Sequence, residues 1–247
     1  MNQKKLQAMK EGGKLLGRIK SQLVKRVMPG LTGVEIDSLA DELIRKANGE
    51  PSFKSVRGYH HATCITVNSG IVHGIPNHHL FQPSDLITID LGLIYQGYHT
   101  DTSVTVGLPP LSKDTANFLT KGKVALAKAI GEALPGNTIY QVSQAMQKEI
   151  ESGGFSVIRD LTGHGIGRHL HEPPHIPCFA DPSQKNLLIK KGQALAIEVM
   201  YSMGDYRLKT EADGWTLSTK DNSLSAMFEE TVFITETGNL VLTSPQY

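Results

Sequence analysis

The 247-residue chain contains little cysteine, one tryptophan and almost no net charge. Its two cysteines, Cys64 and Cys178, are too few for a disulfide framework, which indicates a reducing compartment. With 25 basic and 24 acidic residues the formal charge is +1, so the composition gives no sign of a nucleic-acid-binding surface. The sequence also lacks an apolar secretion signal and any apolar run long enough to span a membrane. These absences predict a cytoplasmic protein.

The rest of the composition, 39% hydrophobic and 20% charged, is that of a globular protein. Apolar residues recur at helical spacing over residues 3–27 until Pro29-Gly30 stops the helix, and residues 32–35 (TGVE) match a capping box that begins a second helix. Residues 53–68 and 86–106 are rich in β-branched and aromatic residues, which predicts strands.

The same order of elements returns in the second half of the chain. A third predicted helix ends at Pro135-Gly136, and residues 138–141 (TIYQ) form a second capping box that begins a fourth. The repeated order indicates two similar halves, residues 1–108 and 109–247, within a single α+β domain over residues 1–247. A functional site in such a fold often lies where the halves meet.

Two aspartates, Asp90 and Asp101, lie in the apolar stretch IDLGLIYQGYHTDTS. A turn at Gln96-Gly97 would place them on the two strands of a hairpin, roughly opposite each other. Solvated strand positions are the simpler interpretation, but the apolar residues around Asp90 predict a strand that is buried on both faces. Two buried carboxylates that face each other need shared protons or bound cations.

Glycines and histidines alternate in the stretch TGHGIGRHLHEPP, residues 162–174. The three glycines predict an irregular loop rather than a helix. A single histidine there would usually be a surface residue, but three within eight residues favour a metal site or a proton-transfer role.

Two more acids interrupt apolar strands, Glu198 in ALAIEVM and Glu229 in AMFEETVFI. A solvent-facing position on an edge strand would explain either of them alone. Together with Asp90, Asp101 and His164 they form a set that needs compensating positive charge, and no lysine or arginine nearby in sequence is an obvious partner for most of them. Four carboxylates and one imidazole suit two divalent ions of the Mn, Co, Fe or Zn kind, which in hydrolases activate water and stabilise an oxyanion.

Seven segments resemble the type I methionine aminopeptidases, the short bacterial form of the pita-bread fold, in the order and close to the spacing of that family. They are PSFKSVRGYHHATCITVN, GIVHGIP, IDLGLIYQGYHTDTS, GHGIGRHLHEPP, AIEVM, DGWTLSTKD and SLSAMFEETV. The resemblance covers nearly the whole chain. It implies two helix–helix–sheet halves around a central antiparallel sheet. It also implies removal of N-terminal methionine from new proteins and peptides with a small second residue, by a hydroxide that bridges two metal ions.

The resemblance also implies a role for each matching position. The five metal ligands would be Asp90, Asp101, His164, Glu198 and Glu229. Of these, Asp101 and Glu229 would bridge both ions, and Glu198 would also carry a proton from water to the leaving amine. His73 would contact the substrate amide, and His171 the scissile carbonyl. The pocket for the methionine side chain would be formed by Tyr59, Cys64, Leu170, Met200 and Trp215.

The sequence departs from the family pattern near these positions. The family usually has Tyr-His where this chain has Val56-Arg57, and a histidine in place of Glu230. None of the departures removes a metal ligand or a catalytic histidine. Arg57 and Glu230 add charges, which we expect to affect the preference for methionine and the pKa values of the metal site.

The expected partners are peptides and nascent chains with N-terminal methionine, with the ribosome as a further candidate and no direct nucleic-acid or membrane binding. The protein is expected to be a monomer. Four alternatives remain open: an aminopeptidase with a shifted first-residue preference; a proline-directed relative, which would usually carry an extra N-terminal domain; a non-catalytic binding relative; and a structural metal site. A structural metal site would not require histidines that bind no metal, such as His73 and His171.

Overall fold

A ten-stranded antiparallel sheet forms the centre of the protein in this computed structural model, which describes residues 3–244. Along the main path of the sheet the strands are β1 (Glu50–Pro51), β4 (Leu86–Tyr95), β5 (Tyr98–Gly107), β12 (Ser225–Ile234), β9 (Ala194–Ser202), β7 (Thr162–Gly165) and β8 (Glu172–Pro177). Three more strands pair beside this path: β2 (Thr63–Val67) with β4, β6 (Ser156–Val157) with β9, and β13 (Asn239–Val241) with β12. The predicted α+β fold with a central antiparallel sheet is confirmed.

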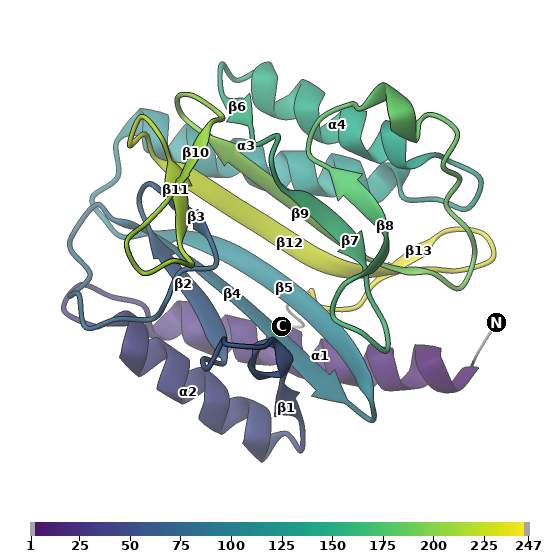
Figure 1. Ribbon diagram of the computed structural model, residues 1–247, viewed down its shortest axis with the longest axis horizontal. Coiled ribbons are helices and arrows are strands. Elements are labelled where there is room, and N and C mark those ends of the chain that lie inside the picture. The colour runs from purple at the N-terminus through teal and green to yellow at the C-terminus, as the bar shows by residue number, and fades with distance from the viewer. Residues whose placement is uncertain (1–2, 245–247) are drawn as a thin grey trace.

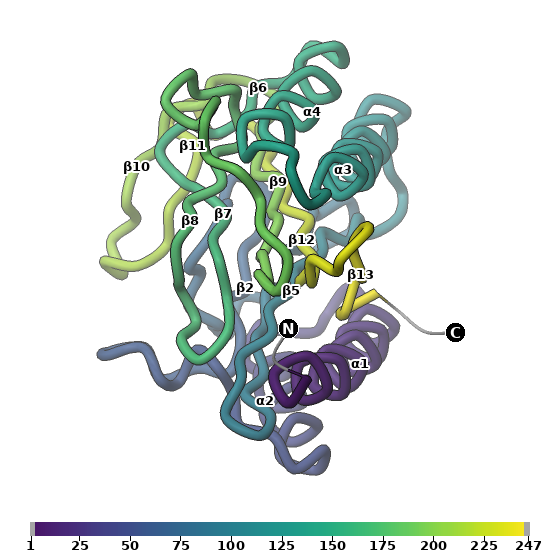
Figure 2. Tube along the Cα trace, turned by 90° about the vertical axis from the view of Figure 1, so that its right-hand side faces the viewer, coloured from purple at the N-terminus to yellow at the C-terminus, as the bar shows by residue number. Residues whose placement is uncertain are grey.

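Helices cover one side of this sheet, and a small second sheet lies on the other side (Figures 1 and 2). The helices are α1 (Gln3–Arg26), α2 (Gly33–Lys46), α3 (Lys113–Glu132) and α4 (Ile139–Glu151). The small sheet consists of β10 (Leu208–Thr210), β11 (Leu217–Thr219) and β3 (Gly70–Val72). No helix between residues 3 and 244 is both long enough and apolar enough to cross a membrane.

The helix boundaries follow from local capping, as the sequence predicts. Thr32 accepts a hydrogen bond from the backbone of Glu35, whose carboxylate accepts one from the backbone of Thr32, and Thr138 and Gln141 repeat this arrangement at the start of α4. Each capping threonine also forms an isolated β-bridge to a leucine, Thr32 to Leu80 and Thr138 to Leu188. These parallels support the predicted division into two similar halves.

Each pair of helices buries its own apolar cluster against the sheet. Leu16, Leu23 and Ile44 of α1 and α2 pack with the first-half strands, whereas Phe118 and Ile150 of α3 and α4 pack with the second-half strands. The second cluster also extends to Ile71 and Val72 of the small sheet. The helices therefore support both halves of the main sheet, and the small sheet covers part of its opposite face.

The two halves meet where β5 pairs with β12. Regular pairing at this β5–β12 junction is short and consists of Ser103 with Glu229 and Thr102 with Glu230. Threonine hydroxyls extend it. The hydroxyl of Thr231 accepts a hydrogen bond from the backbone N–H of Asp101 and donates one to its carbonyl, both at 2.8 Å.

The strand predicted over residues 53–68 is wrong in its first part. Ser52–Ser55 form a 3-10 turn, and only Thr63–Val67 are a strand. The turn closes locally because the Ser55 hydroxyl donates to the Ser52 carbonyl at 2.6 Å and the Val56 amide donates to the Phe53 carbonyl at 3.0 Å. Local side-chain bonding of serine thus outweighs the weak strand preference of this segment.

Two glycines of α3 provide a matched test of how closely this helix approaches the sheet. A Cβ at Gly122 would lie 2.3 Å from the Tyr201 hydroxyl oxygen, whereas a Cβ at Gly131 would have no neighbour within 4 Å. We expect Gly122→Ala to lower the free energy of unfolding by about 1–3 kcal/mol because of overpacking. Gly131→Ala should raise it by up to about 1 kcal/mol, since alanine is the better helix former. Urea denaturation measures both, and equal effects of the two variants would contradict the close contact.

Candidate metal centre and active site

Five consecutive strands of the main sheet each contribute one of the five predicted metal ligands. In spatial order these are Asp90 on β4, Asp101 on β5, Glu229 on β12, Glu198 on β9 and His164 on β7. All five line a single cavity of about 190 Å³, which Val72 of the small sheet also lines, so the cavity lies on the side of the main sheet away from the helices. The first two come from one half of the chain and the other three from the other half. The structure therefore brings the predicted set together across the β5–β12 junction.

The strand register sets how these side chains face one another. Asp90 pairs with Ser103, and Asp101 pairs with Gly92, so the two aspartates are offset by two residues rather than directly opposite. An offset of two keeps them on the same face because side chains alternate along a strand. Glu229 pairs directly with Glu198 in the middle of the sheet, where they are 3% and 9% exposed, and this excludes the solvent-facing edge position.

His164 lies on a strand, although the sequence predicts an irregular loop over residues 162–174. A Cβ at Gly163 would lie 2.6 Å from the Ala196 carbonyl oxygen, so the glycine allows β7 to pack close against β9. The ring Nδ1 of His164 lies 2.9 Å from the Gly165 carbonyl, which can only accept, so Nδ1 carries the proton. The lone pair of Nε2 then remains free for a cation.

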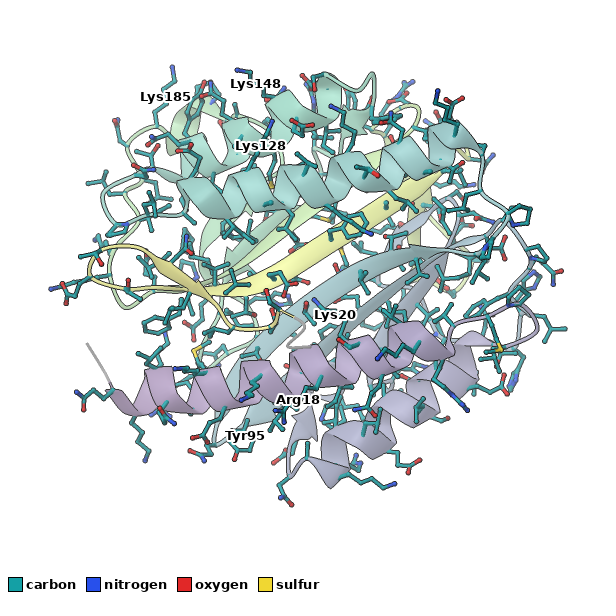
Figure 3. The ribbon with its side chains drawn as sticks, turned by 180° about the vertical axis from the view of Figure 1, so that it is seen from behind. Arg18, Lys20, Tyr95, Lys128, Lys148 and Lys185 are labelled. Carbon is teal, nitrogen blue, oxygen red and sulfur yellow. The ribbon has the colours of Figure 1, made fainter. Side chains whose placement is uncertain are left out.

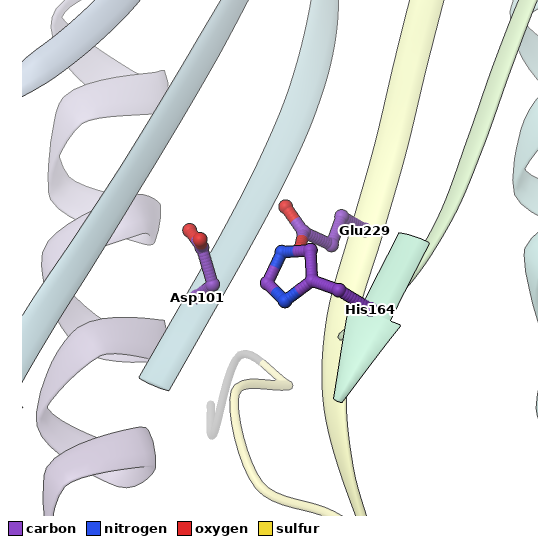
Figure 4. Close-up of side chains that lie close together, drawn as sticks. All are labelled: Asp101, His164 and Glu229. Carbon is purple, nitrogen blue, oxygen red and sulfur yellow. The ribbon is translucent and has the colours of Figure 1, made fainter. Parts of the chain in front are cut away.

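The donor atoms of three of these residues converge (Figure 4). One ligand atom each from Asp101, His164 and Glu229 lie within 4.8 Å of one another, and His164 Nε2 is 4.0 Å from a carboxylate oxygen of Glu198. Within residues 3–244, the buried Oδ1 atom of Asp90 has no hydrogen-bond partner. The unpaired oxygen and the convergent donors leave a space suited to cations.

The electrostatics of the cluster lead to the same conclusion. Burial, followed by repulsion from neighbouring carboxylates, raises the pKa of Asp90, Glu198 and Glu229 well above their usual range. Burial also raises the pKa of Asp101 to about 7, and it lowers that of His164 to about 4. Acidic oxygens that repel one another beside a neutral imidazole are a donor set for divalent metal ions of the Mn, Fe, Co or Zn kind. The residues therefore fit two such ions.

The two predicted catalytic histidines also line this cavity, at its open side. His73 follows β3 with a positive φ of 57°, a conformation uncommon outside glycine, and His171 lies between β7 and β8. The His171 ring is 4.5 Å from that of His164, centroid to centroid, in an edge-to-face arrangement. Partial loss of water, then a neighbouring histidine, lowers the pKa of both. Both rings are therefore neutral near pH 7, and each has one N–H donor and one acceptor.

An apolar pocket continues from the predicted metal centre. Four of the five predicted pocket residues line it, namely Tyr59, Cys64, Leu170 and Trp215. Met200 does not line the cavity and is a correction: it is 1% exposed and lies in the buried cluster that also includes Ile71 and Val72 of β3. Its position two residues after Glu198 predicts the correct face of β9, but the packing partners decide whether a side chain reaches the cavity.

Three pocket residues were missed by the sequence analysis: Phe53, Val56 and Val72 also line the cavity. Phe53 and Val56 come from the 3-10 turn and its end, where three-residue spacing places side chains on one side. Val72 precedes His73 at the end of β3. The available signal was their position inside two of the matched segments, PSFKSV and GIVHGIP.

Comparison with known proteins agrees with this geometry. Residues 7–236 match metallopeptidase family M24. The chain belongs to family M24. A methionine aminopeptidase of Clostridium perfringens is 38% identical to it over 98% of this chain and 97% of its own length. The crystal structure of a methionine aminopeptidase from Thermotoga maritima matches with a TM-score of 0.95 and 38% identity over 99% of this chain and 98% of that one.

A less similar solved structure shows the same fold. The prolidase of Pyrococcus furiosus matches with a TM-score of 0.79 and 20% identity, over all of this chain but only 65% of its own. A proline-directed relative is thus longer than this chain, as the sequence analysis expects for that alternative. The identification as a methionine aminopeptidase relative is confirmed by the two more similar proteins.

The two unusual charges of this M24 member lie outside the cavity. Arg57 is exposed, and its side chain does not line the pocket, unlike that of Val56. Glu230 points to the opposite face of β12 from Glu229, and Lys20 of α1 binds it at 2.7 Å. Glu230 is thus near the metal site but on the helical side of the sheet, and its charge contributes, after burial and the carboxylates of the cluster, to the raised pKa of Glu229, as expected.

The raised pKa values predict how the metal-free protein responds to pH. Unfolded carboxyl groups have pKa values of about 4. The folded cluster therefore binds extra protons, and stability should fall as pH rises from about 4 through about 7, the value of Asp101. Burial lowers the pKa values of four histidines, His73, His99, His164 and His171, and this acts in the opposite direction below about 6.5. The carboxyl groups outweigh them because the pKa values of Asp90, Glu198 and Glu229 lie well above the usual range.

Thermal unfolding in chelator at pH 5 and pH 7.5 measures this effect. We expect a lower Tm at pH 7.5 without metal, a smaller drop in Asp101→Asn, and no drop of this origin when the protein is loaded with Mn²⁺. Equal Tm values for metal-free wild type at the two pH values would contradict the mutual repulsion of the cluster.

Proposed function

We propose that this M24 metallopeptidase removes N-terminal methionine from newly made proteins and peptides whose second residue is small. The observation that carries the proposal is one cavity in which an apolar side-chain pocket opens directly onto the five-residue donor cluster. A pocket of this kind accepts the side chain of the first residue of a peptide and holds the peptide bond that follows it at the donor cluster. The enzyme is therefore an exopeptidase in which the first residue is selected by burial.

Two divalent ions, Co, Mn, Fe or Zn, are the proposed cofactors. Asp90, Asp101, His164, Glu198 and Glu229 would hold them, with Asp101 and Glu229 shared between the two. When bound, the ions supply Lewis acidity and make water a nucleophile near neutral pH. The carboxylates of the empty cluster repel one another, so this cation binding relieves a cost that the fold itself creates.

Glu198 is the proposed proton carrier. Its carboxylate is buried and lines the cavity, where it can accept a proton as a general base. It takes a proton from the attacking water and gives it to the amine that leaves when the first peptide bond breaks. Methionine and a peptide shortened by one residue are the products.

His171 and His73 orient the substrate and stabilise charge. As neutral rings at the open side of the cavity, each can donate one N–H bond. We assign His171 to the scissile carbonyl oxygen, where negative charge develops, and His73 to the substrate amide. Donors fixed in place before the reaction are more effective than water, because they need no reorganisation.

The pocket explains the preference for methionine. Tyr59 and Trp215 stack edge to face with ring centroids 5.2 Å apart, and Tyr59 donates to the Thr63 and Gly74 carbonyls. Cys64 and Leu170 complete apolar walls that suit an unbranched, polarizable thioether. We also propose that the protein is a cytoplasmic monomer that acts on nascent chains and has the ribosome as a partner.

The first test is hydrolysis of a tripeptide panel by metal-stripped protein with Mn, Co, Fe or Zn added back. Met-Ala-Ser should be cleaved only with metal, whereas Leu-, Ala- and Xaa-Pro-started peptides should not. His171→Ala should lower kcat by about 10²–10³-fold, as loss of an oxyanion donor does. No cleavage with any metal would overturn the proposal in favour of a binding role, and release of other first residues would change the substrate.

A second test separates the neighbours Val56 and Arg57. Val56→Ala enlarges the pocket and should raise kcat/KM for bulkier first residues relative to Met by about tenfold, the size of discrimination per methylene group. Arg57→Tyr should leave this ratio unchanged because its side chain lies outside the cavity. A shift in the ratio for Arg57→Tyr alone would show that the exposed side chain reaches the substrate.

A further inference from the structure

A buried lysine lies behind the predicted metal centre, on the helical side of the sheet. Lys20 of α1 is 4% exposed, and lysines are rarely buried unless they are paired. Its ammonium group donates hydrogen bonds to Glu230 Oε1 at 2.7 Å and to Thr102 Oγ1 at 2.6 Å. Figure 3 shows Lys20 on the side of α1 that faces the strands. The lysine thus reaches one strand from each half of the chain.

The residues bound by Lys20 are the immediate neighbours of the two proposed bridging ligands. Thr102 follows Asp101 on β5, and Glu230 follows Glu229 on β12. Side chains alternate between the two faces of a sheet, so the ligands face the cavity while their neighbours face α1. A shift of Thr102 relative to Glu230 would therefore move the two ligands relative to each other.

Hydrogen bonds connect this pair to the ligands through the backbone. The Thr102 hydroxyl donates to the Glu229 carbonyl at 2.8 Å, and the Thr102 amide donates to Asp101 Oδ1 at 2.9 Å. Glu230 also accepts from the Thr243 hydroxyl, which in turn accepts from the Thr231 amide at 2.9 Å. The network thus includes the backbone on both sides of the β5–β12 junction.

This junction has little other regular pairing at the same level. Only two residue pairs are in register between β5 and β12, and one of them is Thr102 with Glu230. By contrast, β4 and β5 pair along their whole length. An ion pair at this point has a large share in setting the spacing of the two strands.

We propose that Lys20 and Glu230 are positioning residues that hold Asp101 and Glu229 at the spacing required to share two metal ions. The inference rests on the proposed metal centre. The pair acts from the opposite face of the sheet and touches neither substrate nor metal. Glu230 is therefore the partner through which α1 fixes the junction.

The test compares three variants with a matched control. Lys20→Met keeps most of the side-chain length without the charge, Glu230→Gln keeps hydrogen-bonding capacity, and the double variant leaves no unpaired charge. The control is Glu149→Gln on α4. It removes a similarly buried carboxylate, 9% exposed, that is paired with Lys121 of α3 at 2.8 Å and lies away from the cavity.

Calorimetric titration of the metal-stripped full chain with Mn²⁺, below the Tm of every variant, gives the decisive readout. Lys20→Met and Glu230→Gln should each weaken Mn²⁺ affinity by about 10- to 100-fold, the usual effect of changing a residue behind a metal ligand. The double variant should lose less than the sum of the two single losses in log affinity. Glu149→Gln should lower the Tm and leave Mn²⁺ affinity within twofold of wild type.

The outcomes separate the two proposals. If wild type binds Mn²⁺ and the Lys20 and Glu230 variants bind equally well despite a lower Tm, the pair is merely structural and the inference is wrong. If Lys20→Met does not fold, Glu230→Gln alone decides, because it changes only charge. If wild type binds none of Mn²⁺, Co²⁺, Fe²⁺ and Zn²⁺, the proposed function fails together with the inference.

Discussion

Mutual repulsion among four carboxylates at the centre of the sheet is the constraint on which the rest of this structure depends. Each acid comes from a different strand, and no lysine or arginine lines the cavity that they share. The strands must therefore hold together groups that would otherwise separate. Two apolar clusters behind the sheet and the hydrogen bonds across the β5–β12 junction oppose this repulsion. Divalent cations turn this repulsion into attraction between the ions and the carboxylates. The same arrangement therefore destabilises the metal-free protein and favours metal binding.

The parts of this arrangement that local chemistry determines could be predicted from the sequence. Capping boxes at Thr32 and Thr138 begin α2 and α4, and Pro-Gly pairs end the helices before them. The donor set could also be identified, because isolated acids in apolar strands need an explanation. The register of Asp90 and Asp101 could also be predicted, because a two-residue turn at Gln96-Gly97 pairs Tyr95 with Tyr98 and hence Asp90 with Ser103.

What could not be predicted depends on contacts between distant parts of the chain. Lys20 and Glu230 are 210 residues apart, and nothing in either local sequence indicates the other. From the local sequence alone Glu230 has no identifiable partner, because only the position of α1 against the sheet brings Lys20 to it. Met200 shows the opposite error. Its position on β9 was right, but its side chain is buried in the cluster that includes Ile71 and Val72 of the small sheet rather than in the pocket.

The division of the ligands between the two halves has a consequence for how the protein is made. Asp90 and Asp101 leave the ribosome before Glu229, which lies on β12, a strand that begins only at Ser225. A chain that stops anywhere before that strand contains at most four of the five predicted ligands. Such a copy cannot assemble the five-residue cluster, and hydrolytic activity must wait until β12 has been made.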